Sequence, residues 1–148
     1  MIENILIPTD GSPNASKAVN AGVQLAKQLG ATVTGYCAFE TATAGADFEG
    51  YGIGRADADG ALVKSARDTG ENSVAEIAKA AADAGVPFVA VVDEAAAPDD
   101  GIIRAALEHR CDLIVMASRG RSGLAGLVLG SVTNNVLSHS TIPVHVIR

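Results

Sequence analysis

Short apolar runs alternate with segments of helical periodicity along the whole chain, and this alternation most narrows the folds open to it. Ile5 to Ile7 and Leu113 to Met116 are short runs of the buried kind. The predicted strands cover 2–9, 32–39, 86–92, 113–117 and 142–147. The predicted helices cover 13–29, 61–84, a segment from Pro98 through Leu107, and 131–138. Helical crossovers make the joined strands parallel, so the pattern predicts a single-domain α/β sandwich over 1–148, with five parallel strands between helices.

Local signals support these boundaries and leave one long segment without a regular pattern. Ser12 before Pro13 predicts a helix N-cap, Gly30 a C-cap, and Ser131 the cap of the last helix. Glycines and acids recur through 40–60, which predicts an acidic loop that could act as a lid.

Charge is unevenly distributed along the 148 residues. The formal net charge of −6 argues against general binding to nucleic acid or to anionic membranes. All seventeen acids lie in 1–112, whereas 113–148 contain three arginines and no acid. The acid-free part could hold an anion; the alternative is that a short segment lacks acids by chance.

The cysteines and the apolar runs bear on location. Cys37 and Cys111 lie far apart without a CxxC pattern, which predicts neither a disulfide framework nor a zinc site. A reducing, cytoplasmic compartment is the expectation. The first residues do not resemble a signal peptide, and no run of 18 apolar residues predicts a membrane span.

The segment from Ser118 to Ser131 carries the strongest chemical signal. Its glycines allow backbone N–H groups to approach a phosphate, and Gly130-Ser131 falls at a predicted helix N-terminus. Arg119 and Arg121 supply charge suited to phosphate. The alternative is an ordinary loop with two solvated arginines. Neither a Walker A loop nor the Rossmann glycine spacing is present.

In the residues of this segment and in two others, the chain resembles the nucleotide-binding subgroup of the universal stress protein family. That subgroup carries G-x2-G-x9-G-[S/T] after the fourth strand, and this chain has Ala117, Gly120, Gly130 and Ser131 at those positions. The segments PTDGS at 8–12 and IPVHVI at 142–147 also match, and the resemblance spans the whole chain. The resemblance implies a flavodoxin-like strand order of 3-2-1-4-5.

The resemblance also implies a site for ATP or AMP, with Mg²⁺ as a possible companion of ATP. By position, Pro8, Thr9 and Asp10 would line the base and ribose side. Cys37 falls where the backbone of family members meets adenine.

Met116 and Ala117 would border the sugar. The residues that would hold the phosphates are Gly120, Gly130, Ser131 and Val132. Arg119 is added from its charge alone. Ala117 departs from the glycine of the motif, and its methyl group would crowd a close approach unless its φ is negative.

Asp10 and the last strand each leave two interpretations open. Asp10 could bond a ribose hydroxyl or help to place Mg²⁺, or it could cap the first helix together with Ser12. The strand 142–147 would be a sheet edge, and the resemblance implies a homodimer through it. Alternatively, Pro143 and Arg148 protect that edge.

The expected function is that of a nucleotide-responsive stress or regulatory protein. The three histidines form no catalytic set and no general base is evident, so hydrolysis is expected to be slow at most. The alternatives are an ATPase of the same fold, and a dimeric interaction module whose pocket binds no nucleotide because Ala117 obstructs it.

Overall fold

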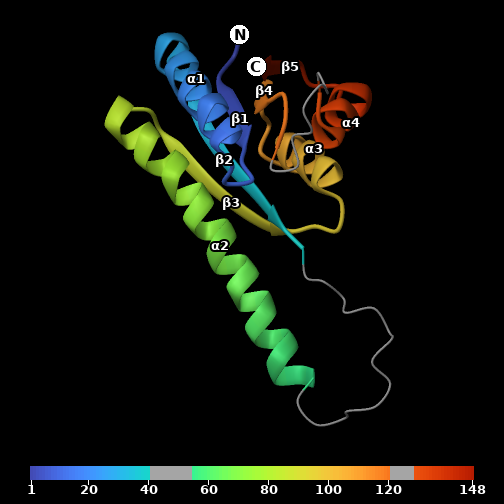
Figure 1. The fold of residues 1–148 in the computed structure, drawn as a ribbon. Helices are drawn as coiled ribbons and strands as arrows, with labels where there is room; N and C mark the ends of the chain where they lie inside the picture. The colour runs from blue at the N-terminus through green and yellow to red at the C-terminus, as the bar shows by residue number, and fades with distance from the viewer. Residues whose placement is uncertain (41–54, 121–128) are drawn as a thin grey trace.

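The computed structural model describes residues 1–40, 55–120 and 129–148, which form five strands and four helices (Figure 1). The strands are β1 (Asn4–Pro8), β2 (Thr32–Phe39), β3 (Phe88–Glu94), β4 (Leu113–Ala117) and β5 (Val144–Ile147). The helices are α1 (Pro13–Leu29), α2 (Arg55–Ala84), α3 (Pro98–Glu108) and α4 (Ser131–His139). The strands form one sheet in the order β3-β2-β1-β4-β5, and every neighbouring pair is parallel. The strand order expected from the family resemblance is therefore confirmed.

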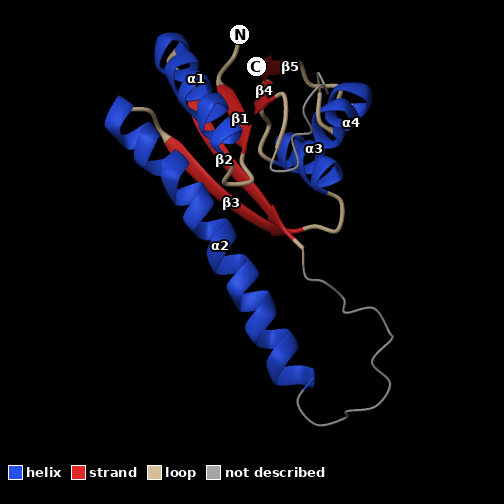
Figure 2. Cartoon of the chain, in the orientation of Figure 1, coloured by secondary structure: helices blue, strands red, loops and turns tan. Residues whose placement is uncertain are grey.

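Two helices cover each face of the sheet, as Figure 2 shows. On one face, Ile5, Ile7 and Val33 pack against side chains of α1 and α2 such as Val23 and Ile77. On the other face, Leu6, Tyr36, Ile114 and Met116 pack against α3 and α4. Alternate residues of a strand point to opposite faces, so the short apolar runs fill both halves of the core.

The strand order places a crevice at the carboxyl ends of β1 and β4. The chain leaves β1 toward β2 and β3 on one side and returns to β4 and β5 on the other. A point where strand order reverses in this way is where α/β sheets bind ligands.

The caps of α1 follow the sequence signals. Ser12 is the N-cap, and its Oγ accepts a hydrogen bond from the N–H of Ala15 at 3.2 Å. Gly30 ends the helix with φ 69°, a left-handed conformation in which glycine carries no steric penalty.

Several predicted boundaries were wrong by a few residues. β1 begins at Asn4 because the amides of Glu3 and Asn4 turn toward the carboxylate of Asp112. β3 begins at Phe88, not at residue 86, because the N–H of Val86 still bonds back to Ala81 of α2.

The last helix and strand also begin differently from the prediction. Gly130, not Ser131, is the N-cap of α4, and Ser131 is its first residue, because the carbonyl of Gly130 already accepts the N–H of Asn134. β5 begins at Val144, not at residue 142, because Ser140 holds Ile142 in a turn through two hydrogen bonds of 2.9 and 3.0 Å.

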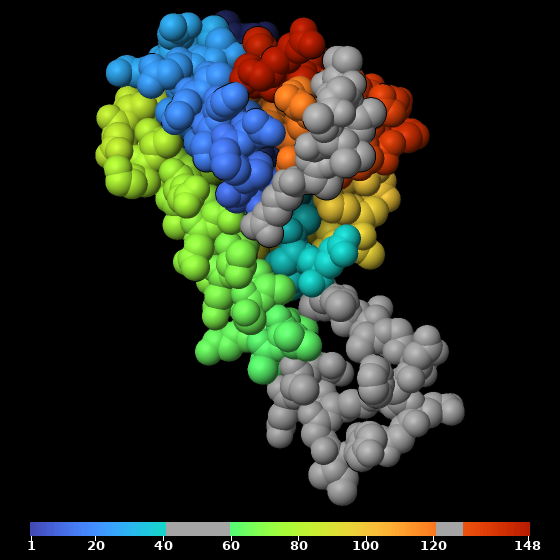
Figure 3. Space-filling model, viewed as in Figure 1, coloured from blue at the N-terminus to red at the C-terminus, as the bar shows by residue number. Residues whose placement is uncertain are grey.

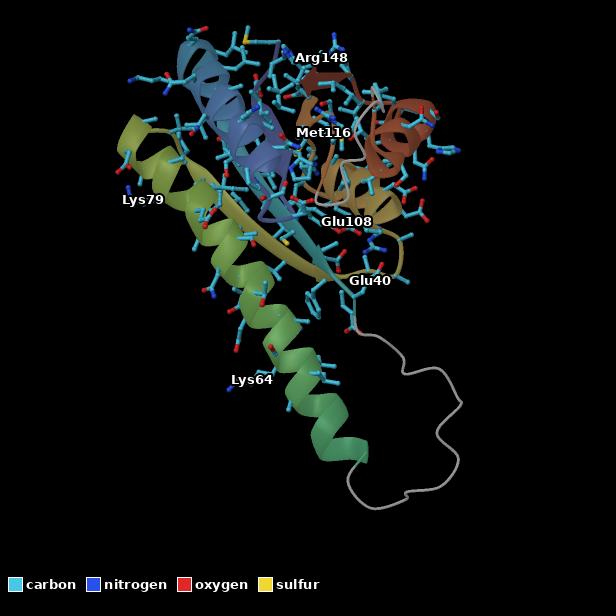
Figure 4. All side chains as sticks on the ribbon, in the orientation of Figure 1. Glu40, Lys64, Lys79, Glu108, Met116 and Arg148 are labelled. Atoms are coloured by element: carbon cyan, nitrogen blue, oxygen red, sulfur yellow. The ribbon has the colours of Figure 1, made fainter. Side chains whose placement is uncertain are left out.

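The predicted loop at 40–60 was wrong at its carboxyl end, where α2 begins at Arg55. Alanine is the strongest helix former, and one glycine within a helix costs only about 1 kcal/mol, so Gly60 does not end it. Residues 41–54, and with them the lid hypothesis, lie outside the described residues. The amino-terminal part of α2 extends past the sheet, and Lys64 lies on that part (Figure 4).

None of the helices in the described ranges combines the length and the apolar character needed to cross a membrane.

Candidate functional site

A cavity of about 300 Å³ lies at the carboxyl ends of β1, β2 and β4. The first turns of α1, α3 and α4 also contribute to it, which brings three helix N-termini to the same space. The lining residues of the described chain are Pro8, Thr9, Asp10, Ala15, Tyr36, Ala38, Pro98, Ile102, Met116, Ala117, Arg119, Gly120, Gly130, Ser131, Val132 and Thr133.

The structure brings together ten of the eleven residues expected to line a nucleotide site, whereas Arg121, also noted for its charge, lies outside the described residues. Pro8, Thr9 and Asp10 share this cavity with the other predicted site residues, which are Met116, Ala117, Arg119, Gly120, Gly130, Ser131 and Val132. Cys37 is not among the lining residues, because its side chain is directed toward α2. A Cβ added at Gly70 of α2 would lie 3.7 Å from the Cys37 sulfur.

One end of the cavity is suited to an anion. α4 begins without a side-chain cap and with no acid in its first turn, and Ser131, Val132 and Thr133 of that turn line the cavity. The first N–H groups of a helix have no partner within it, and the dipole adds partial positive charge there. Arg119 lines the same end.

Hydrogen bonds hold the backbone on both sides of this anion-suited end. The N–H of Gly130 donates to the carbonyl of Ser118 at 2.7 Å, and the Thr133 hydroxyl donates to the carbonyl of Ala117 at 2.8 Å. The end of β4 and the first turn of α4 are thereby fixed to each other. The N–H groups at the start of α4 are consequently oriented before any ligand arrives.

Asp10 lies between the β1 turn and Gly120. One carboxylate oxygen accepts the N–H of Ser12 at 2.9 Å, while Ser12 itself caps α1. A Cβ added at Gly120 would lie 2.5 Å from the other carboxylate oxygen, so the two segments are in close contact. Asp10 thus supports the turn before α1 and also lines the cavity, which is compatible with both roles weighed for it.

Ala117 has an ordinary backbone conformation. It is the last residue of β4 and pairs with Ile147 of β5. Among the described residues other than glycine, a positive φ occurs at Arg110 alone. The fold therefore does not require glycine at position 117. Where the family motif has glycine, Ala117 adds one methyl group.

The opposite end of the cavity is apolar and was missed by the sequence analysis. Tyr36 and Ala38 of β2 line it together with Pro98 and Ile102 of α3. Alternation along β2 could have identified Tyr36 and Ala38, since they share the face opposite to Cys37. Met116 lies in the interior between the two helix layers and lines the cavity as well (Figure 4).

A polar network anchors Tyr36 behind this apolar end. The Tyr36 hydroxyl hydrogen-bonds Asp93 at 3.3 Å, and Asp93 forms an ion pair with Arg104 of α3. Burial is the main cause that raises the pKa of Tyr36 far above its ordinary value, and the charge of Asp93 adds to it. The phenol therefore stays protonated and can donate its hydrogen to Asp93.

The described cavity walls contain one carboxylate, that of Asp10. No group of three or more His, Cys, Asp or Glu side chains that could hold a metal ion occurs within 1–40, 55–120 and 129–148. A divalent cation would depend on Asp10 together with oxygens of a ligand, as Mg²⁺ often does at phosphate sites.

Comparisons with known proteins give consistent results over the full length. The model of the universal stress protein family matches residues 1–148. Universal stress protein MJ0531 of Methanocaldococcus jannaschii is 28% identical over 149 residues, which cover 100% of this chain and 83% of that protein.

Two solved structures extend the comparison to three dimensions. The fold matches universal stress protein UspA from Lactobacillus plantarum with a TM-score of 0.83 at 21% identity, over 99% of this chain and 98% of that one. A universal stress protein in complex with cAMP matches with a TM-score of 0.64 at 26% identity, over 99% and 97% of the two chains.

Proposed function

Because this chain belongs to the universal stress protein family, we propose that it binds an adenine nucleotide in the cavity described above and acts as a nucleotide-responsive stress or regulatory protein. The observation that carries this proposal is the pairing of two unlike ends in one cavity. The uncapped N-terminus of α4 and Arg119 suit a phosphate, whereas Tyr36 and Ile102 suit a flat heterocycle.

The two ends define an orientation for the nucleotide. Phosphates would accept hydrogen bonds from the backbone at Gly120, Gly130, Ser131 and Val132, and the guanidinium of Arg119 would add charge. The sugar would lie by Met116 and Ala117, with Asp10 accepting a hydrogen bond from a ribose hydroxyl. The base would lie at the end of β2, where the backbone at Cys37 is the predicted adenine contact.

The related protein solved with cAMP supports an adenine nucleotide as the ligand class. We infer that ATP or AMP occupies the site, and that Mg²⁺ accompanies ATP through Asp10 and the phosphate oxygens.

The proposal is tested by identifying the small molecules that co-purify with the protein. Purified protein is denatured and the released small molecules are separated by chromatography. Co-purified ATP or AMP, or a thermal shift on adding either nucleotide, supports the proposal. No released nucleotide and no thermal shift at millimolar nucleotide would overturn it in favour of an interaction module. ATP turnover that disappears in Asp10→Ala would instead make the protein an ATPase.

We further propose a homodimer through β5. β5 is an edge strand, and the carbonyls of Ile147 and of Pro143, the residue before the strand, accept hydrogen bonds from Ser118 and Ile114 on the β4 side. By alternation, Val144 and Val146 turn their backbone groups outward, where a second copy could pair with them.

Val146→Pro removes an outward N–H of this edge without touching the bonds to β4. Sedimentation should show a wild-type dimer and a monomeric, folded variant. A wild-type monomer at high protein concentration, or a variant that still dimerises, would refute pairing through β5. A cytoplasmic location remains a prediction from the cysteine pattern.

A further inference from the structure

The ring of Tyr36 belongs both to the core and to the wall of the cavity. Its side chain is 1% exposed and packs with Ile102 and Met116, which also line the cavity. In the sheet it lies directly beside Pro8. A shift of this ring would therefore change the shape of the apolar end.

Three neighbours determine where the ring lies. Asp93 holds the hydroxyl, and Arg104 of α3 holds Asp93. Gly101 of α3 leaves the space through which the phenol passes, because a Cβ added there would overlap the Tyr36 hydroxyl. Its next contacts, 3.1 Å to the Cβ of Ala95 and 3.3 Å to the ring carbon that carries the hydroxyl, need shifts of only a few tenths of an ångström. Figure 3 shows the end of β2 (cyan) and α3 (yellow) meeting at the surface on this side.

The apolar end is separated from the anion end by the width of the sheet between β2 and β4. Those strands flank β1, so their ends lie two strand spacings apart, or about 10 Å. A group that contacts Tyr36 is therefore a different part of the ligand from the group that contacts the start of α4.

Resting on the proposed nucleotide site, we propose that Tyr36 contacts the base and sets the width of the base site, with Gly101 and Asp93 as the residues that position it. Affinity for the base then depends on Tyr36, whereas affinity for the sugar phosphate does not. Asp93 and Arg104 act only through Tyr36, because neither is among the lining residues of the described chain.

The test combines Gly101→Ala, Tyr36→Phe and the double variant with two probes, AMP and ribose 5-phosphate, which lacks a base. Affinities are measured by NMR titration into the millimolar range. Gly101→Ala displaces the phenol, so AMP binding should weaken about tenfold while ribose 5-phosphate stays within about twofold of wild type. Tyr36→Phe removes the overlapping oxygen, so the double variant should regain AMP affinity to within about threefold of wild type.

An effect of Gly101→Ala that is equal for both probes, or one that Tyr36→Phe does not relieve, would overturn the inference and leave Gly101 a purely structural position. The AMP measurements on the three variants decide this by themselves. Should Gly101→Ala not fold alone, Tyr36→Leu replaces it: AMP affinity should fall about tenfold and that of ribose 5-phosphate should not. A wild-type protein that binds neither ATP nor AMP would refute the proposed function itself.

Discussion

Replacement of Gly130 by alanine should separate ligand binding from stability. Gly130 has φ −72° and ψ 163°, a conformation open to any residue. A Cβ added there would meet Arg119 Cα at 3.5 Å, the Ser118 oxygen at 3.6 Å and the Gly120 nitrogen at 3.8 Å, which are ordinary contacts. The fold therefore accommodates alanine at Gly130.

Two opposing effects on stability nearly cancel in Gly130→Ala. Loss of conformational freedom in the unfolded chain favours alanine by about 0.4–1 kcal/mol. The preference for glycine over alanine at an N-cap opposes this by a similar amount. The free energy of unfolding should stay within about 0.5 kcal/mol of wild type, which corresponds to a change in Tm of about 2 °C or less.

Binding should respond quite differently to the same methyl group. It would lie between the backbone of Arg119 and the start of α4, where the proposed phosphate would approach the N–H groups. Loss of one charge-assisted hydrogen bond costs about 1.5–3 kcal/mol, so affinity for AMP should fall about tenfold or more.

Calorimetric titration with AMP and thermal unfolding measure the two quantities on the same Gly130→Ala sample. Gly60→Ala is the matched control, because Gly60 lies on α2 with nothing within 4 Å of an added Cβ. It should raise stability by about 0.5–1 kcal/mol without changing affinity. Unchanged AMP affinity in Gly130→Ala would refute a phosphate at the start of α4, and a large loss of stability would refute the account of the loop.

Three further changes have defined outcomes. Arg119→Ala should weaken AMP binding about fivefold, less so at high salt, as titrations at two ionic strengths would detect; an equal loss at both would exclude a charge effect. Arg110→Gly should raise the free energy of unfolding by about 1 kcal/mol in chemical denaturation, since Arg110 has φ 52°, and no gain would show that the conformation is not strained. The N–H groups of Glu3 and Asn4 lower the pKa of Asp112. The contribution of this carboxylate to the free energy of unfolding is therefore present at neutral pH and lost as the pH falls below about 4. Asp112→Asn should therefore be less stable than wild type near pH 7, with the difference closing in acid; a constant difference would contradict this.

The sequence predicted the architecture because each element carries its own signal. Ile5 to Ile7 form a run too short and too apolar for anything but a buried strand, and Ser12 with Pro13 defines the start of α1. The start of α2 was missed because the glycines before it suggested a loop, whereas the alanines beside Gly60 favour a helix.

The anion end of the site was predictable because its residues are nearly continuous in sequence. Gly120, Gly130 and Ser131 belong to one motif, Arg119 stands beside it, and the carboxyl ends of parallel strands meet at the same edge. The apolar end was not predictable in this way. Tyr36 and Ile102 line the cavity only because β2 and α3 pack together, and tertiary packing selects which face of β2 points there.

The central claim, an adenine nucleotide spanning this cavity, is tested most directly by a crystal structure of the protein with AMP. The phosphate should accept hydrogen bonds from the N–H groups of Ser131 and Val132, and the base should lie against Tyr36. A nucleotide bound elsewhere, or no bound nucleotide at saturating AMP, would contradict the claim.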